Sequence, residues 1–137
     1  MKSLEESIVK LVQEHLDYVH SIYLFGSRAD GKYVQPNSDW DVAVLSKDYK
    51  GFSALEIWNN QLEIAAKLDI ELDLVDLRNV STIFQYEILK SCRILWTEDE
   101  VFARLFEARL LGEYQDFHES QKLNLQEIVL RGSVYGA

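Results

Sequence analysis

The sequence predicts an α/β or α+β domain, in which helices cover a small mixed β-sheet and a helical segment follows. Two observations carry this prediction: amphipathic stretches alternate with short apolar runs over the first two thirds of the chain, and the last third shows only helical patterns. The chain has 137 residues, a usual size for one domain, and it contains no repeat or linker. We therefore expect a single domain over 1–137, with a core at about 1–97 and C-terminal helices at about 99–132.

Apolar residues that recur at steps of three and four residues predict the helices. This spacing places helices at about 3–16, 53–67 and 80–90, and one or two more after residue 98 that end near Gly132. Turn residues separate the first two strands, at Gly31, Pro36 and Asn37.

Short runs rich in β-branched and aromatic residues predict four strands. They are SIYLF (21–25), DWDVAVL (39–45), DIELDLVDL (69–77) and RILW (93–96).

The C-terminal third carries more apolar residues than one helix needs for packing on the domain. Packing into the core is the simpler explanation, and docking of a partner is the alternative. The residues concerned are Tyr114, Phe117, Leu123, Leu125, Ile128, Val129 and Leu130.

The charge balance restricts the classes of partner. With 23 acidic and 14 basic residues, the net charge of −9 repels phosphate backbones, so direct binding of nucleic acid is not expected. Acidity suits a basic protein, a cationic small substrate or metal ions, although it can also serve solubility alone. No apolar run approaches the ~20 residues of a membrane span. The first residues lack the pattern of a signal peptide, so we expect a cytoplasmic protein.

Two aspartates open the second predicted strand. Side chains alternate across a strand, so Asp39 and Asp41 share one face while Trp40 and Val42 share the other. Carboxylates about 6–7 Å apart repel each other unless solvent or a cation lies between them, and Mg²⁺ binds such oxygens. The alternative is an exposed strand end, with Asp39 capping a turn.

The third strand offers another carboxylate. Its apolar residues share one face, which leaves Glu71 and Asp73 on the opposite face and puts Asp76 on the apolar side. If this strand lies beside the second, Asp73 can join Asp39 and Asp41 around one or two metal ions. Periodicity does not exclude Glu71 from that position.

The first strand ends in Gly26-Ser27, followed by Arg28. Such a turn, at an expected helix start, exposes backbone N–H groups and a hydroxyl to an anionic phosphate. Gly26 lets the backbone approach a ligand closely, and Arg28 can add a charge-assisted contact. Alone, a Gly-Ser pair can equally be a helix cap, and Arg28 a surface residue.

Together, the stretch LFGSRADGKYVQPNSDWDVAVL and the downstream LDLVDL resemble the nucleotidyltransferase superfamily related to DNA polymerase beta, and within it the minimal nucleotidyltransferases. Gly26-Ser27, Asp39 and Asp41 match the motif of that family, with a spacer one residue longer than usual, and Asp73 matches by its place in the strand. The resemblance covers about residues 20–97.

The resemblance implies a mixed β-sheet fold, ATP as the donor and Mg²⁺, expected as two ions, as the cofactor. Asp39, Asp41 and Asp73 would hold the metal, and Gly26, Ser27 and Arg28 would bind the nucleotide phosphates. Nucleotide monophosphate would pass to an acceptor hydroxyl, with Asp73 able to accept the proton and pyrophosphate as the leaving group.

Minimal nucleotidyltransferases are commonly antitoxins of type VII-like HEPN/MNT modules. The resemblance therefore implies that this chain attaches AMP to a hydroxyl, expected on tyrosine, of a cognate HEPN ribonuclease toxin. Two alternatives stay open: a transferase acting on a small molecule of the aminoglycoside type, and a non-catalytic protein that only covers its toxin.

Overall fold

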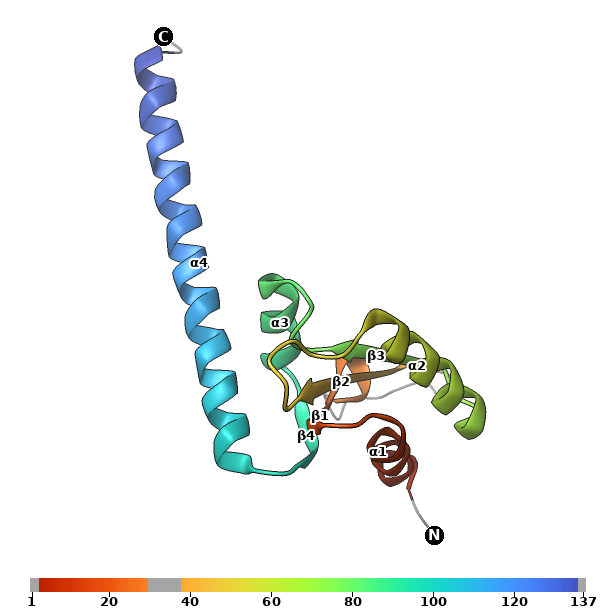
Figure 1. The fold of residues 1–137 in the computed structure, drawn as a ribbon. Coiled ribbons are helices and arrows are strands. Elements are labelled where there is room, and N and C mark those ends of the chain that lie inside the picture. Colours follow the sequence, from red (N-terminus) through yellow and green to blue (C-terminus); the bar gives the residue numbers. More distant parts are fainter. Residues whose placement is uncertain (1–2, 30–37, 136–137) are drawn as a thin grey trace.

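A computed structural model of the chain describes residues 3–29 and 38–135. It contains the predicted alternation of helices and strands (Figure 1). The elements are α1 (Leu4–His15), β1 (Val19–Phe25), the 3₁₀ turn η1 (Gly26–Arg28), β2 (Trp40–Ser46), α2 (Ala54–Leu68), β3 (Leu72–Asp76), α3 (Thr82–Leu89), β4 (Arg93–Thr97) and α4 (Glu100–Tyr135). The expected turns at Gly31, Pro36 and Asn37 lie outside the described residues.

The four strands form one mixed sheet in the order β3-β2-β1-β4, which confirms the predicted fold class. β1 pairs antiparallel with both β2 and β4, whereas β2 and β3 are parallel. A parallel pair needs a crossover connection, and α2 supplies it. β3 is an edge strand, and the Gln61 side chain of α2 accepts a hydrogen bond from the Leu74 N–H at 2.8 Å, which satisfies one backbone donor on that edge.

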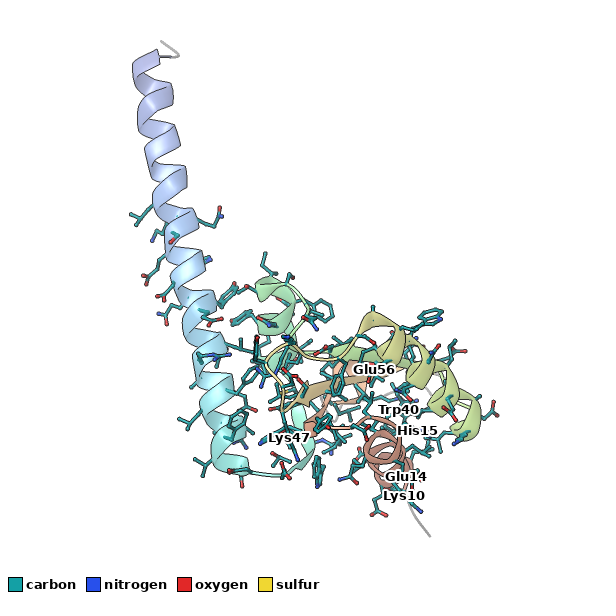
Figure 2. The ribbon with its side chains drawn as sticks, viewed as in Figure 1. Lys10, Glu14, His15, Trp40, Lys47 and Glu56 are labelled. Atoms are coloured by element: carbon teal, nitrogen blue, oxygen red, sulfur yellow. The ribbon has the colours of Figure 1, made fainter. Side chains whose placement is uncertain are left out.

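Side-chain alternation gives the sheet a core on each face. One core lies under α1 and α2 and takes the alternate β2 residues Trp40, Val42 and Val44. Figure 2 shows Trp40 in this layer, between the sheet and the two helices. The other core lies under α3 and α4 and takes Ala43 and Leu45 from β2.

Helix α2 begins at a capping box in which Ser53 and Glu56 each bind the backbone of the other. The predicted helix is confirmed, but the apolar residues that indicated it do not all face the core. Its buried side is built on Ile64, whereas three apolar side chains of the helix are more than half exposed, namely Leu55, Trp58 and Leu62. The sequence spacing identified the helix, while packing on the sheet selected the buried face.

Helix α4 is one continuous helix of 36 residues that runs through Gly132. Its first turns pack on the domain through Ala103, Phe106 and Leu110, and the Tyr114 ring stacks on Tyr86 of α3 at 3.8 Å between centroids. The second half runs away from the sheet (Figure 1).

The expectation of core packing for the C-terminal apolar residues is therefore wrong for Leu123, which is 65% exposed. The side chains of Phe117, Leu125, Ile128, Val129 and Leu130 lie outside the described residues. In the described part of the chain, no helix combines the length and apolar character that crossing a membrane requires.

Candidate active site

The turn after β1 brings glycine backbone against a carboxylate. Gly26 has a φ of +75°, in the left-handed region, and a Cβ built on it would lie 2.2 Å from Oδ2 of Asp41. Only glycine fits this approach without displacing Asp41. The Ala29 N–H then donates to the Gly26 carbonyl at 3.1 Å, so the expected helix start is a 3₁₀ turn, and it leaves Ser27 exposed.

Three side chains form a row across one face of the sheet. Phe25 of β1 is the register partner of Asp41 in β2, and Asp41 is the register partner of Asp73 in β3. Register partners on neighbouring strands point to the same side, here the side of α3 and α4. As predicted, Asp41 therefore lies on the opposite face of the sheet from Trp40 and Val42.

Asp41, in the middle of this row, has a raised pKa. Partial burial raises its pKa to about 6, and the charge and hydrogen bonding of the neighbouring Asp73 add to the rise. Asp39, exposed just before β2, contributes a smaller repulsion in the same direction. Removing a carboxylate from water and placing other carboxylates beside it both disfavour ionisation.

The structure distinguishes the two candidates for the third carboxylate. Asp73 lies beside Asp41 in register and shifts its pKa, whereas Glu71 precedes β3 and is absent from the causes of that shift. The Glu71 backbone has a structural task, since its carbonyl accepts a hydrogen bond from the Trp40 N–H at 2.8 Å. Asp73 is thus the acid that β3 places next to Asp41.

Asp76 lies at the other end of β3 and on the other face, as its parity predicts. It is 7% exposed and accepts hydrogen bonds from the Phe52 N–H at 2.7 Å, the Arg78 N–H at 3.1 Å and the Asn79 side chain at 2.7 Å. These bonds hold the β2–α2 connection against the end of β3. Asp76 is a structural carboxylate.

Arg28 makes contacts within the chain that sequence analysis did not foresee. Its guanidinium donates to the Ser38 carbonyl through Nε at 3.1 Å and Nη2 at 2.8 Å, and it lies 4.2 Å from the centre of the Trp40 ring. Arg28 thereby connects the end of η1 to the residue before Asp39. The expected contact between Arg28 and a nucleotide phosphate stays a prediction.

The carboxylates suit a hard divalent cation. Asp41 and Asp73 present neighbouring oxygen ligands whose repulsion a cation would remove, and Mg²⁺ is usually held by only one or two carboxylates together with water and substrate phosphates. Over residues 3–29 and 38–135, no three potential ligands already form a group that could hold a metal ion. Completing a three-carboxylate site would therefore require the exposed Asp39 side chain to turn toward the pair.

Sequence reasoning also missed a pair of aromatic side chains, Phe25 and Phe84, of which Phe25 is the register partner of Asp41. The Phe25 ring meets the Phe84 ring of α3 edge to face, with centroids 6.1 Å apart and planes at 87°. The position of Phe25 directly before Gly26 was a usable signal, but the approach of Phe84 depends on how α3 crosses the sheet.

The family model and the known proteins that this chain matches are all nucleotidyltransferases. Residues 6–101 match the family described as "Polymerase beta, Nucleotidyltransferase". The protein adenylyltransferase MntA of Shewanella oneidensis is 30% identical over 128 residues, which cover 91% of this chain and 87% of that protein. The protein of the same name from Aphanizomenon flos-aquae is 29% identical over 135 residues, with the same coverage of both chains.

Solved structures agree with these matches. A crystal structure of a toxin–antitoxin with AMP-PNP contains a chain that superposes with a TM-score of 0.79 at 29% identity, covering 93% of this chain and 99% of the other. A complex of the tri-AMPylated HEPN toxin of Shewanella oneidensis with the MNT antitoxin gives a TM-score of 0.74 at 27% identity, covering 91% and 95%. The family match extends over more than half of the chain and includes both strands that carry the Asp41–Asp73 pair. This chain is therefore a member of the polymerase beta nucleotidyltransferase family.

Proposed function

We propose that this chain is the antitoxin of a HEPN/MNT module and transfers AMP from ATP to a hydroxyl of its cognate HEPN toxin, with tyrosine as the acceptor. The observation that carries the proposal is the Asp41–Asp73 pair beside the Gly26–Ser27 turn, in a chain that matches protein adenylyltransferases over nearly its whole length. ATP as donor is supported by the related complex with AMP-PNP. Modification would neutralise the toxin.

The carboxylates would act together with Mg²⁺. Asp39, Asp41 and Asp73 would hold the ions, which supply charge neutralisation and alignment of the attacking and leaving oxygens of an in-line displacement. The raised pKa of Asp41, to about 6, means that a cation and the proton compete for this carboxylate. At neutral pH Asp41 is ionised and ready to bind a cation.

Asp73 would take the proton of the acceptor. It is exposed on the edge strand β3, where an incoming hydroxyl can reach it, and it adjoins Asp41. The acceptor oxygen forms a bond to the α-phosphorus, the bond from that phosphorus to the bridging oxygen of the β-phosphate breaks, and pyrophosphate leaves. The hydroxyl proton passes to the Asp73 carboxylate.

The Gly26–Ser27 turn would hold the terminal phosphates. The Gly26 backbone adjoins Asp41, and the exposed Ser27 hydroxyl is available as a donor. Positioning and charge neutralisation of this kind provide most of the catalysis of phosphoryl transfer.

A protein acceptor suits the openness of the site. Ser27, Asp39 and Asp73 are all exposed, so a side chain carried on another protein can reach them. Helix α4 offers a surface for docking that protein, because it extends away from the sheet (Figure 1) and exposes Leu111 and Leu123. We place the toxin against this helix and the open side of the site.

The test combines the purified protein, Mg²⁺, ATP and the HEPN-like protein encoded beside it, and follows the toxin by intact mass. We expect AMP on the toxin with the unmodified chain and with Glu71→Gln, and none with Asp73→Asn. Glu71 is the matched control because it is also exposed and lies two residues from Asp73 on the same edge. Transfer to an aminoglycoside and to no protein would instead identify a small-molecule transferase.

A further inference from the structure

The row formed by Asp73, Asp41 and Phe25 ends at Phe25, whose ring contacts the ring of Phe84. Phe25 is the register partner of Asp41, so its ring stands next to the Asp41 carboxylate on the same face. Phe84, in the first turn of α3, meets that ring edge to face at 6.1 Å and remains 41% exposed. A partly exposed ring thus contacts a second ring that neighbours Asp41.

The order of the strands assigns Phe25, and through the ring contact Phe84, to one half of the site. Asp73 lies on β3, Asp41 on β2 and Phe25 on β1, and the Gly26–Ser27 turn continues directly from Phe25. The proposed proton acceptor is therefore two strands, about 10 Å, from Phe25. Phe25 directly precedes the phosphate turn, and Phe84 reaches this half of the site through its contact with Phe25.

We propose that Phe84, backed by Phe25, stacks on the adenine ring of ATP and makes the site prefer purine nucleotides. This inference rests on the proposed function, because it places ATP at the Gly26–Ser27 turn. A nucleobase has a flat, weakly polar face that binds aromatic side chains by stacking. The edge-to-face contact holds Phe84 in place before the base arrives, so little conformational entropy is lost on binding.

The variant Phe84→Ala removes the ring from a half-exposed position, and Phe84→Tyr keeps it. Ile83→Ala is the matched control, because Ile83 adjoins Phe84 on α3 and is 54% exposed. For each variant, calorimetry in Mg²⁺ without toxin measures the binding of ATP, UTP and inorganic tripolyphosphate. The KM for ATP and the KM for the toxin are then measured separately in the transfer reaction.

We expect Phe84→Ala to weaken ATP binding and raise the KM for ATP about tenfold, the effect of losing one base-stacking contact. Tripolyphosphate, which has no base, should bind as before, and the preference for ATP over UTP should shrink. Phe84→Tyr and Ile83→Ala should behave like the unmodified chain.

Two results would overturn the inference. One is an equal loss of ATP and tripolyphosphate binding in Phe84→Ala, which would indicate a structural effect on the phosphate turn. The other is a raised KM for the toxin with an unchanged KM for ATP, which would assign the ring to the acceptor. If the unmodified chain transfers no AMP, the proposed function fails, while the calorimetry still decides whether Phe84 contacts the base.

Discussion

Asp41 of β2 and Asp73 of β3 are register partners in the parallel pair of the sheet, and the charge of Asp73 helps to raise the pKa of Asp41 to about 6. Two carboxylates in contact destabilise a fold unless a cation or a proton lies between them. This repulsion lies beside Gly26, the left-handed glycine that directly follows β1.

Asp73→Asn should lose activity but not stability, whereas Asp76→Asn should lose stability. Asp73 is exposed and repels Asp41, so its substitution should remove AMP transfer while the metal-free melting temperature holds or rises. Asp76 is buried among three donors, and its amide variant should lower the free energy of unfolding by about 1–3 kcal/mol because at least one donor loses its acceptor. Thermal melts and transfer assays on both variants check this. Normal transfer by Asp73→Asn would show that β3 contributes no essential carboxylate.

The stability of the metal-free protein should depend on Asp41. Native Asp41 keeps its proton up to a pH of about 6, whereas unfolded aspartate loses it near pH 3.9. The native state thus binds more protons between these values, so the free energy of unfolding should fall as pH rises from about 4 to about 6. Because Asp41 is partly solvated, we expect a contribution of about 1 kcal/mol.

Urea unfolding in a chelator across this pH range measures the effect. The matched variant is Asp41→Asn, in which this part of the pH dependence should disappear. Added Mg²⁺ should restore stability above pH 6 in the unmodified chain and not in the variant. An identical pH dependence in both proteins would contradict the placement of Asp41 beside Asp73.

The double variant Asp39→Asn with Asp41→Asn should fold, bind the toxin and transfer nothing. Replacing two acids with amides removes the ligands for Mg²⁺ and also relieves repulsion, so the metal-free melting temperature should hold or rise. Docking on α4 should survive, which size-exclusion chromatography with the toxin measures. Lasting protection of cells by this variant would indicate that the antitoxin acts by covering the toxin rather than by modifying it.

Arg28→Ala should reduce transfer without unfolding the domain. The substitution removes both hydrogen bonds to the Ser38 carbonyl and the contact with Trp40, so Asp39 loses the anchor on its preceding residue. A lower affinity for Mg²⁺, measured by calorimetry without nucleotide, would identify Arg28 as a positioning residue for Asp39. If Mg²⁺ binding is unchanged and only the KM for ATP rises, Arg28 acts on the phosphates instead.

Gly26→Ala should disrupt the site more than Ser27→Ala. A Cβ at Gly26 would lie 2.2 Å from Oδ2 of Asp41 and would require a left-handed backbone, so Asp41 or the turn has to move. Ser27 is exposed, and its variant should only slow transfer by weakening the phosphate contact. Transfer rates of the two variants, measured below and above the KM for ATP, test this order.

The sequence by itself determined the features that depend on local periodicity and local backbone geometry. Alternation along a strand put Asp41 opposite Trp40, and helical spacing predicted α1, α2 and α3 close to their observed bounds. Gly26 after an apolar strand predicted a close approach of the backbone to a ligand, and the structure adds that its left-handed φ and the Asp41 carboxylate leave no room for a Cβ. These inferences need no knowledge of which element packs on which.

The tertiary structure decided everything that depends on pairing between distant segments. Strand register selected Asp73 over Glu71 as the neighbour of Asp41, since parity alone places both on one face. Packing on the sheet turned the Trp58 face of α2 outward, although its spacing fits a core as well as that of Ile64. The contacts of Arg28 with Ser38 and of Phe25 with Phe84 join residues whose spacing in the chain carries no signal, because side-chain contacts across a fold depend on its topology.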